Sequence, residues 1–528
     1  VRKYLIENYG SDSLYRDGLK VYTTLNRDYQ YYSEKALRIQ LHILDKRQGW
    51  RKDKPNLVDM EIEEWEQILK PLKDKNNPDR VLLDSWLKLS VENGDIVEAI
   101  VLEVERRKAG VKVRDYTGIL TNKKIAWTKS NNLKTLVKKG DIIHVRVDKI
   151  DEEKKTLQVT LDQEPELEGA FLAIEPQTGQ IKAMIGGYSF KRLKFNQATQ
   201  AMRQSGSVIK PLLYTAALEN GYSPTSIFID EPTEFPDKWS GTIYSPPNYD
   251  EKYKGAVTLR QGLEESRNIV SVRVLDAISP QVGVDYVKKF GITSPYIYPY
   301  LSLALGAFEI RMIELVSAFS TFPNKGVRIT PYLITRVEDK DGNILKESEI
   351  ESYEVISPQL AYIMTTFLRG VVQRGTAWPA AVLEKKLCGK TGTTDDFSDA
   401  WFMGFSPKLC AGVWIGHEKE RRKIGDRQSG MVAALPVWQS FFSQIIEEEK
   451  KTAEEAGEEY KPEEFEIPPH LEFVEIDRRT GLLFNPFICL SQYMIREVFL
   501  PTMTKPSRHC SYEDHMMTYD YYRSLVKK

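Results

Sequence analysis

The stretch SGSVIKP at residues 205–211 places the amine of Lys210 one helical turn after the hydroxyl of Ser207. Residues three apart on a helix lie on the same face, so these two side chains are expected to be neighbours. A serine hydroxyl is a weak nucleophile that needs an adjacent base, and a desolvated lysine can be neutral and accept the proton. Gly206 permits a tight turn, so we expect a helix over residues 207–220 with Ser207 at its N-terminus.

This spacing is not specific by itself. It occurs twice more, at Ser85/Lys88 and at Ser524/Lys527, which is about what chance gives in a long chain. A second element, the SRN of residues 266–268, offers a hydroxyl that can relay a proton and an amide that can orient a lysine and a substrate amide. A second copy of this pattern, SNN at residues 130–132, lies in a part of the chain with a different character.

The third element is KTGTT at residues 390–394, the only Lys-Thr-Gly in the chain. On a strand, we expect the cation of Lys390 and the hydroxyls of Thr391 and Thr393 to face one way and bind a carboxylate. Gly392 would let a substrate backbone approach closely. The backbone N–H of Thr393 could pair with that of Ser207 as an oxyanion hole.

Taken in this order, Ser-x-x-Lys, Ser-x-Asn and Lys-Thr-Gly form the set that serine penicillin-recognising enzymes share. The flanking sequence resembles class A penicillin-binding proteins of the 1A type over nearly the whole chain, to about residue 445. The segments that carry this resemblance are GLKVYTTL at 18–25, DKRQGWR at 45–51, FNQATQ at 195–200, VTLR at 257–260 and DAWF at 399–402.

The resemblance implies a D,D-transpeptidase that cross-links peptidoglycan stem peptides through a serine acyl-enzyme and is inhibited by β-lactams. Ser207 would attack the penultimate D-Ala carbonyl of the donor peptide, and Lys210 would take the proton. The acceptor would be a side-chain amine of a neighbouring stem peptide. The other implied roles are proton movement by Ser266 and Asn268, binding of the terminal carboxylate by Lys390, Thr391, Gly392 and Thr393, and an oxyanion hole at Ser207 and Thr393. No cofactor is expected.

The chain departs from the family pattern in two ways. Ser205 stands where the family has proline, and Val208 and Ile209 separate the serine from the lysine, which bears on substrate preference. No glycosyltransferase signature is present, so we expect the transpeptidase part of a bifunctional parent that lacks its glycosyltransferase domain here. The sequence has no signal peptide and no apolar run of about 18 residues. Any anchor would then lie upstream, with the chain on the periplasmic face of the bacterial inner membrane.

The sequence predicts an α/β (α+β) chain: a penicillin-recognising transpeptidase fold, with a sheet flanked by helices, plus a small all-β domain of the OB type. In the first part we expect a strand within residues 14–24, a helix at 27–45 and a short helix near 62–69. Later helices are expected at 258–276, 308–323, 358–374 and 431–449, and strands at 170–187, 385–393, 400–406 and 409–416. The expected divisions are a linker strand segment at 1–30, a helical connector at 31–85, the OB-like domain at 86–165, the transpeptidase domain at 166–450, and an acidic linker with the C-terminal tail at 451–528.

The OB-like domain is indicated by short runs of alternating residues separated by glycines between residues 92 and 163. Five short strands of this kind suit a small barrel, a fold that often binds oligonucleotides or oligosaccharides. We favour a structural insert or a docking surface for a protein regulator. Lys123, Lys124 and Lys129 are interpreted as solvated loop charges, and no nucleic acid is expected.

The composition also gives no indication of nucleic-acid binding, because the net charge of the chain is only -1. Cys388 and Cys410 fall in apolar runs and are expected to be core residues, whereas Cys489 and Cys510 could form a disulfide in an extracytoplasmic protein. No CxxC pair occurs and the six histidines are scattered, so no metal site is predicted.

Three rival functions use the same motifs. A β-lactamase would be shorter and would carry Glu-x-x-Leu-Asn, but the single Leu-Asn of this chain follows Tyr22 rather than a glutamate. A D,D-carboxypeptidase differs only in using water as the acceptor, so it stays open. A β-lactam-binding sensor needs no catalysis, and the intact Ser207, Lys210 and Lys390 argue against it.

Overall fold

The computed structural model describes residues 1–51, 56, 91–190, 192–237, 241–394, 396–418 and 421–515. The chain divides into two compact units, one made of Val1–Gln40 and Leu167–Lys528 and the other of Leu41–Glu166. The expected helix near 62–69 and the extra Ser-x-x-Lys pairs, Ser85/Lys88 and Ser524/Lys527, lie outside the described residues. Among those described, no helix is both long and apolar enough to cross a membrane.

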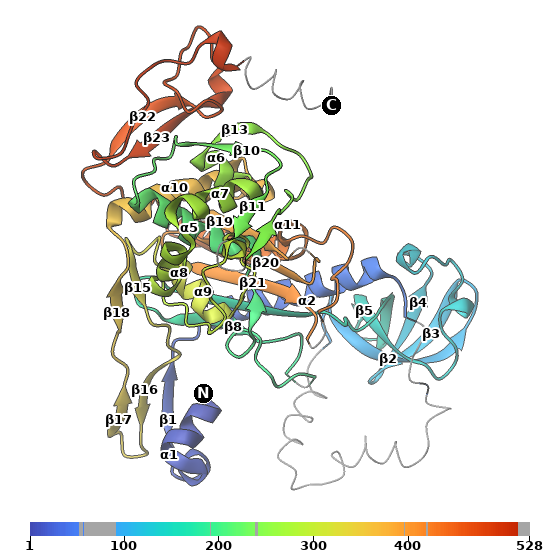
Figure 1. Ribbon diagram of the computed structural model, residues 1–528. Coiled ribbons are helices and arrows are strands. Elements are labelled where there is room, and N and C mark those ends of the chain that lie inside the picture. The colour runs from blue at the N-terminus through green and yellow to red at the C-terminus, as the bar shows by residue number, and fades with distance from the viewer. Residues whose placement is uncertain are drawn as a thin grey trace. The chain divides into compact units, whose positions relative to one another are not determined.

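The first unit is built on a five-stranded sheet of order β19-β20-β21-β7-β8, in which every neighbouring pair is antiparallel (Figure 1). The early hairpin joins the late strands through the pairing of β21 with β7, as in Trp414 opposite Ala170. The strands expected at 170–187, 385–393, 400–406 and 409–416 are confirmed, and all of them belong to this one sheet. The strands are β7 (Glu168–Ile174), β8 (Ile181–Ile185), β19 (Cys388–Thr393), β20 (Asp399–Phe405) and β21 (Cys410–Gly416).

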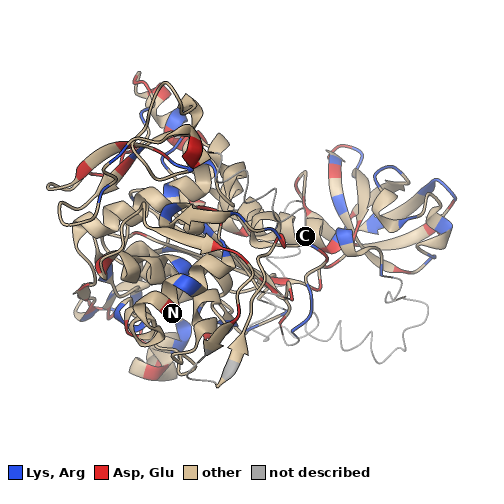
Figure 2. Cartoon of the chain, turned by 45° about the horizontal axis from the view of Figure 1, so that its top comes forward, with Lys and Arg blue, Asp and Glu red and all other residues tan. Residues whose placement is uncertain are grey.

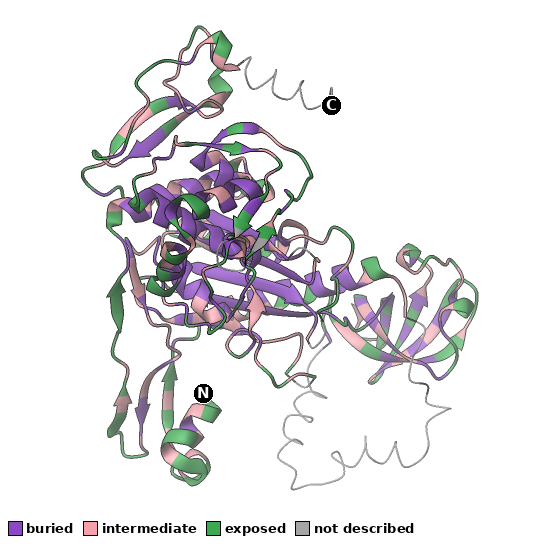
Figure 3. Cartoon of the chain, in the orientation of Figure 1, coloured by how far each residue is buried: buried purple, intermediate pink, exposed green. Residues whose placement is uncertain are grey.

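Helices bury both faces of this sheet, which explains why its central strands β7, β20 and β21 are buried along their whole length (Figure 3). On β20, Trp401 and Met403 belong to the main core with the central helices. Phe402 points the other way and packs against Trp438, with ring centroids 4.9 Å apart. The helices are α2 (Arg27–Gln48), α5 (Lys210–Glu219), α6 (Leu259–Glu264), α7 (Asn268–Ile278), α8 (Pro280–Lys289), α9 (Met312–Ser320), α10 (Pro358–Gln373), α11 (Gly430–Ala433) and α12 (Leu435–Glu455).

The single helix expected at 258–276 is wrong, because the chain forms α6 and α7 with a sharp break at Ser266. Ser266 has a left-handed backbone with φ of 58°. The N–H of Arg267 donates to the carbonyl of Gly262 at 2.9 Å, and the N–H of Ser266 donates to the carbonyl of Leu263 at 3.1 Å. These bonds satisfy the carbonyl groups at the end of α6. A left-handed residue, usually glycine, commonly closes a helix in this way. Because this position holds a serine and not a glycine, the sequence gives no signal of the break.

Two further expectations need correction, and two features were not predicted. The acidic linker expected from residue 451 begins later, because α12 continues to Glu455. The strand expected within 14–24 covers only β1 (Lys20–Thr23), since helix α1 (Arg2–Arg16) occupies the residues before it. The helix α8 and the sheet that β1 forms with β16 (Ile334–Glu338) and β17 (Ile344–Glu347) were not predicted.

The C-terminal piece, residues 470–515, is an antiparallel pair of β22 (Glu472–Asp477) and β23 (Met494–Phe499) with its connecting loops. Val498 and Phe499 join the main core of the unit. Beside them, the buried Glu497 accepts hydrogen bonds from the guanidinium of Arg260 on α6. Cys489 and Cys510 are joined by a disulfide, which sequence analysis left open, and their Cα atoms lie 7.2 Å apart.

The second unit contains a closed barrel of order β2-β3-β4-β6-β5, which confirms the predicted five-stranded module. Its alternating apolar side chains, among them Val111, Leu120 and Val145, fill the interior. Gly118 allows close packing, since a Cβ atom there would lie 2.8 Å from Val111. The strands are β2 (Ile96–Val104), β3 (Lys108–Val113), β4 (Tyr116–Thr121), β5 (Ile142–Asp151) and β6 (Thr156–Asp162).

Candidate active site

Ser207 lies in a short 3-10 helix, η3 (Gly206–Ile209), that leads directly into α5. The helix predicted at 207–220 is therefore confirmed, except that its first turn is 3-10 and the backbone N–H of Lys210 donates to the carbonyl of Ser207. Gly206 has φ of 55°, and a Cβ atom there would lie 2.8 Å from the carbonyl oxygen of Thr393. Only glycine satisfies both conditions, so Gly206 lets the serine turn approach β19.

Lys210 is fully buried and joins the first motif to the second. Its Nζ donates to Asn268 Oδ1 at 2.8 Å and to the carbonyl of Ser266 at 2.9 Å. The hydroxyl of Ser266 lies 3.5 Å from the same nitrogen. The second Ser-x-Asn copy, at residues 130–132, lies in the other unit. Lys210, Ser266 and Asn268, by contrast, meet as the sequence predicts.

Ser266 also meets the third motif, because Lys390 Nζ donates to its Oγ at 2.8 Å. One hydroxyl thus lies beside the amines of both lysines. The left-handed backbone of Ser266 directs both its carbonyl and its hydroxyl toward them. Strained backbone of this kind costs about 1–3 kcal/mol and clusters at functional sites.

A polar network that sequence analysis missed holds this segment in place. Asn248 Oδ1 accepts from the backbone N–H of Asn268 at 2.9 Å, and its Nδ2 donates to Asp230 at 2.7 Å. Asp230 also accepts from the buried guanidinium of Arg267 at 2.8 Å. No motif contains Asn248 or Asp230, so only the fold identifies them.

On β19, Lys390, Thr391 and Thr393 of the third motif have different neighbours. Thr391 Oγ1 lies 2.8 Å from Thr376 Oγ1, and Thr393 Oγ1 accepts from the backbone N–H of Gly430 at 2.9 Å. Since β19 pairs regularly with β20, Lys390 lies on the opposite face from both threonines. The expectation that the cation and the hydroxyls share one face of the strand is therefore wrong.

Gly392 completes the junction between the serine turn and the strand. A Cβ atom there would lie 2.8 Å from Val208 and 3.0 Å from the carbonyl of Ser205. Trp401 of β20 fixes the same junction by donating to the carbonyl of Gln204 at 2.7 Å. The fold thus brings all three motifs together, with Ser207, Ser266 and Asn268 half-buried and both lysines buried.

Burial lowers the pKa of Lys390 from 10.5 to about 7. A cation is poorly solvated in this position, so the folded protein binds the proton of Lys390 less tightly than the unfolded chain does. Below pH 7 the folded protein must hold this buried charge. Between pH 7 and 10.5 the unfolded chain binds more protons, so the unfavourable contribution of Lys390 to stability fades as the pH rises.

We therefore expect a Lys390→Met variant to melt at a higher temperature than the parent, with the largest gain below pH 7 and none above pH 10.5. Thermal unfolding followed by circular dichroism across this range measures the gain. Lys194→Met, at an exposed position, is the matched control and should leave the melting temperature nearly unchanged at each pH. A gain for Lys390→Met that is equal at every pH would contradict the assignment.

Comparisons with known proteins agree with this geometry. Residues 169–434, which are 266 of the 528 residues, match the family model of the penicillin binding protein transpeptidase domain. Residues 90–161 match the S1 RNA binding domain. S1 domains are OB folds, so this match and the closed barrel confirm the predicted fold of the second unit.

Curated relatives extend the similarity along the chain. Penicillin-binding protein 1A of Rickettsia typhi is 30% identical over 524 residues, covering 94% of this chain and 62% of its own length. Penicillin-binding protein 1A of Neisseria meningitidis is 33% identical over 454 residues, covering 84% of this chain and 54% of its own length. The chain therefore spans less than two thirds of these relatives.

Solved structures share the fold. The crystal structure of penicillin-binding protein 1A from Haemophilus influenzae has a TM-score of 0.79 and 25% identity, covering 97% of this chain and 76% of that one. The PonA1 protein from Mycobacterium tuberculosis, solved in complex with penicillin V, has a TM-score of 0.54 and 18% identity, with 89% and 96% of the two chains covered. With the family match spanning half of the sequence, the chain belongs to the penicillin-binding protein transpeptidase family.

Proposed function

We propose that the chain is a D,D-transpeptidase that cross-links peptidoglycan stem peptides through an acyl-enzyme on Ser207. The observation that carries this proposal is the placement of Ser266 Oγ between two buried amines, 2.8 Å from Lys390 and 3.5 Å from Lys210. Lys210 in turn adjoins Ser207, because its backbone N–H donates to the carbonyl of that serine. Such an arrangement can pass a proton from one group to the next during acyl transfer.

In the first half-reaction, neutral Lys210 takes the proton of Ser207 as its Oγ attacks the penultimate D-Ala carbonyl. The negative charge on the carbonyl oxygen is stabilised by the backbone N–H groups of Ser207 and Thr393. The packing of Gly206 against Thr393 supports this pairing, since it brings the two backbones together. The C–N bond then breaks, and terminal D-Ala leaves with a proton passed through Ser266, while Asn268 orients Lys210.

In the second half-reaction, the amine of a neighbouring stem peptide attacks the acyl-enzyme. A peptide bond forms, Ser207 Oγ leaves and regains a proton, and the cross-link is complete. Lys390, Thr391, Gly392 and Thr393 are assigned to binding the carboxylate end of the donor. Protonated Lys390 supplies positive charge from beneath the strand, and the threonine hydroxyls supply hydrogen bonds from its other face.

β-Lactams would be attacked by the same serine, because they present a strained amide beside a carboxylate, as the D-Ala-D-Ala end does. A structural relative, PonA1, has been solved in complex with penicillin V, which supports penicillin as a ligand here. Because peptidoglycan lies outside the cytoplasm, we place this chain on the periplasmic face of the inner membrane.

For the barrel we propose docking of a protein regulator rather than binding of nucleic acid. Several of its basic groups are paired with carboxylates, including Lys124 and Arg146 with Asp148, and Lys155 with Asp115. Figure 2, in which basic residues are blue and acidic residues red, shows both kinds along this part of the chain. A nucleic-acid site instead needs basic groups available to phosphates.

The experiment that tests the proposed function is covalent labelling with benzylpenicillin, followed by mass spectrometry of the intact chain. We expect one adduct per chain, and fragmentation of the labelled peptide should assign it to Ser207 rather than to Ser205. No adduct, or one at Ser85 or Ser524, would overturn the assignment. A D-Ala-D-Ala peptide incubated with and without an amine acceptor then separates the two acyl transfers: cross-linked product indicates a transpeptidase, and hydrolysis alone a carboxypeptidase.

A further inference from the structure

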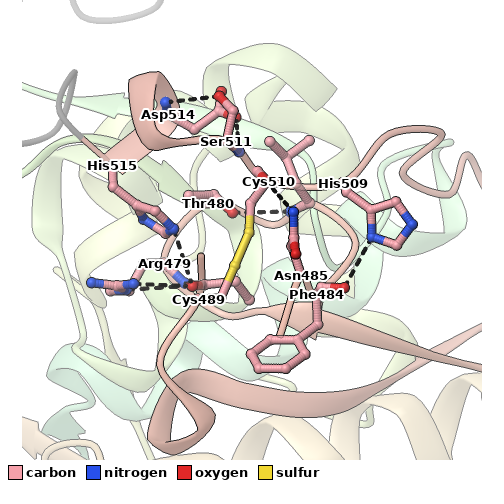
Figure 4. Close-up of a disulfide and its surroundings, with 12 residues drawn as sticks. Arg479, Thr480, Phe484, Asn485, Cys489, His509, Cys510, Ser511, Asp514 and His515 are labelled. Carbon is pink, nitrogen blue, oxygen red and sulfur yellow. Dashed lines mark hydrogen bonds and ion pairs between the residues drawn. A yellow bond between two sulfur atoms is a disulfide. The ribbon is translucent and has the colours of Figure 1, made fainter. Parts of the chain in front are cut away.

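Four metal-ligating side chains meet in the C-terminal piece, away from the residues assigned to acyl transfer. They are Asp477, Cys489, Cys510 and His515, and their ligand atoms all lie within 4.8 Å of one another. Figure 4 shows Cys489, Cys510 and His515 in this cluster beside Arg479. The first three are buried and His515 is half-buried. Thiolate sulfur, imidazole nitrogen and carboxylate oxygen are all ligand types that Zn²⁺ takes in proteins, and four ligands complete a tetrahedral site.

The cluster gathers three separate segments of the piece. Asp477 ends β22, Cys489 lies in the loop that follows, and Cys510 and His515 come after β23. Backbone hydrogen bonds fix both cysteines, with the N–H of Cys489 donating to Asn485 at 2.7 Å and that of Cys510 to Leu483 at 3.0 Å. Both cysteines are thus held by backbone contacts as well as by the disulfide.

The backbone positions of the cysteines suit a shared metal better than a disulfide. Their Cα atoms lie 7.2 Å apart, whereas disulfides usually span about 4.4–6.8 Å. Two thiolates on one tetrahedral zinc have their sulfurs about 3.7 Å apart, given a Zn–S bond of about 2.3 Å. The wider backbone separation therefore accommodates a bridging ion.

The charges around the cluster also balance. Two thiolates and one carboxylate carry three negative charges, and Zn²⁺ with the guanidinium of Arg479 supplies three positive ones. Arg479 donates to Asp477 through its backbone N–H at 2.8 Å and its Nη2 at 3.0 Å. A carboxylate has four lone-pair sites, so Asp477 can bind a metal while it keeps these contacts. Arg479 would then hold Asp477 in the orientation that binds the metal, without touching the metal itself.

We propose that the C-terminal piece binds one Zn²⁺ through Cys489 Sγ, Cys510 Sγ, His515 and Asp477 when the two cysteines are reduced. A dithiol reductant opens the disulfide by exchange, giving two thiols and the oxidised reductant. Zn²⁺ then replaces the two thiol protons, which pass to solvent as both Zn–S bonds form. The disulfide is the metal-free, oxidised form of the same site.

A metal at this point would stabilise a piece with little core of its own. Few of its apolar side chains are buried, chiefly Ile476, Val498, Phe499 and Met503. Pieces of this size commonly depend on a disulfide or a structural metal. Zn²⁺ would join the end of β22 to both later segments, whereas the disulfide joins only the two later segments to each other.

The test uses the full chain, reduced and then dialysed with Zn²⁺ or Co²⁺ without oxygen. We expect one ion per chain by elemental analysis, and thiolate-to-cobalt charge-transfer bands with the visible bands of a tetrahedral site. Cys489→Ser and Cys510→Ser should each abolish the charge-transfer spectrum of the wild-type site, and His515→Ala should weaken binding by about tenfold or more. His509→Ala is the matched control, because this histidine is exposed and lies next to Cys510.

Two outcomes would overturn the proposal. One is a reduced wild-type chain that binds no ion, which needs no variant and so is independent of any folding defect. The other is a Cys489→Ser chain, folded by circular dichroism, that binds the ion as tightly as the parent. Penicillin labelling of Ser207 is measured separately, so failure of the metal site leaves the proposed acyl transfer untouched.

Discussion

Ser207→Ala will form no covalent adduct with benzylpenicillin, while its melting temperature stays close to that of the parent. The side-chain oxygen is the only heavy atom removed, and it belongs to a half-buried side chain on the turn that faces β19. Without it no acyl-enzyme can form, so the loss is complete rather than partial. Intact mass spectrometry after prolonged incubation measures the adduct, and circular dichroism checks the fold.

Ser205→Ala is the matched control for this variant. It removes the same atom two residues earlier, where the hydroxyl is buried and donates to the carbonyl of Gly306 at 3.3 Å. We expect this variant to be labelled once per chain, like the parent. Labelling of Ser207→Ala at the parent rate would refute Ser207 as the nucleophile.

Lys210→Met will slow acylation by about 100-fold to 10,000-fold, the range that a general base contributes. Methionine has nearly the same length and fits a buried site, but it cannot accept the proton of Ser207. Stopped-flow or quenched-flow labelling with a fluorescent penicillin gives the rate constant. A rate within about tenfold of the parent would contradict the role of Lys210 as the base.

Lys210→Arg separates a base from a merely structural cation. Arginine keeps the positive charge and can still donate to Asn268 and to the carbonyl of Ser266, the two contacts that Lys210 makes at 2.8 and 2.9 Å. It cannot lose its proton in a protein, so it should not restore the rate. Rescue by arginine would indicate that Lys210 only holds the motif segments together.

Strands with strong patterns were predictable from sequence. Alternating residues filled the barrel interior, and the apolar runs before and after the helices became β7 and β19 to β21. Weakly patterned elements were not. Strand β17 is mostly exposed and pairs only at the edge of β16, so its residues lack an apolar alternation that could have revealed it.

Within the site, the motifs predicted which residues meet but not how they are presented. The left-handed Ser266 follows from hydrogen bonds that close α6, and a serine gives no sign of such a turn. Thr376 and Asn248 belong to no motif, yet they contact Thr391 and Asn268 directly. Contacts between segments more than a hundred residues apart, such as Lys390 with Ser266, depend on the tertiary fold.

The contact between Arg260 and Glu497 bears on where the transpeptidase-family domain ends. Both side chains are buried, and Arg260 lies in α6, just before the Ser266 turn, with its guanidinium 4.1 Å from the ring centroid of Phe367. A fragment trimmed to the family match at 169–434 would discard Glu497, strand β23 and the apolar pair Val498 and Phe499. The buried guanidinium would keep its contacts with Glu264 and Thr366 but lose the paired carboxylate of Glu497, so the last strands belong to the framework of the domain rather than to a dispensable tail.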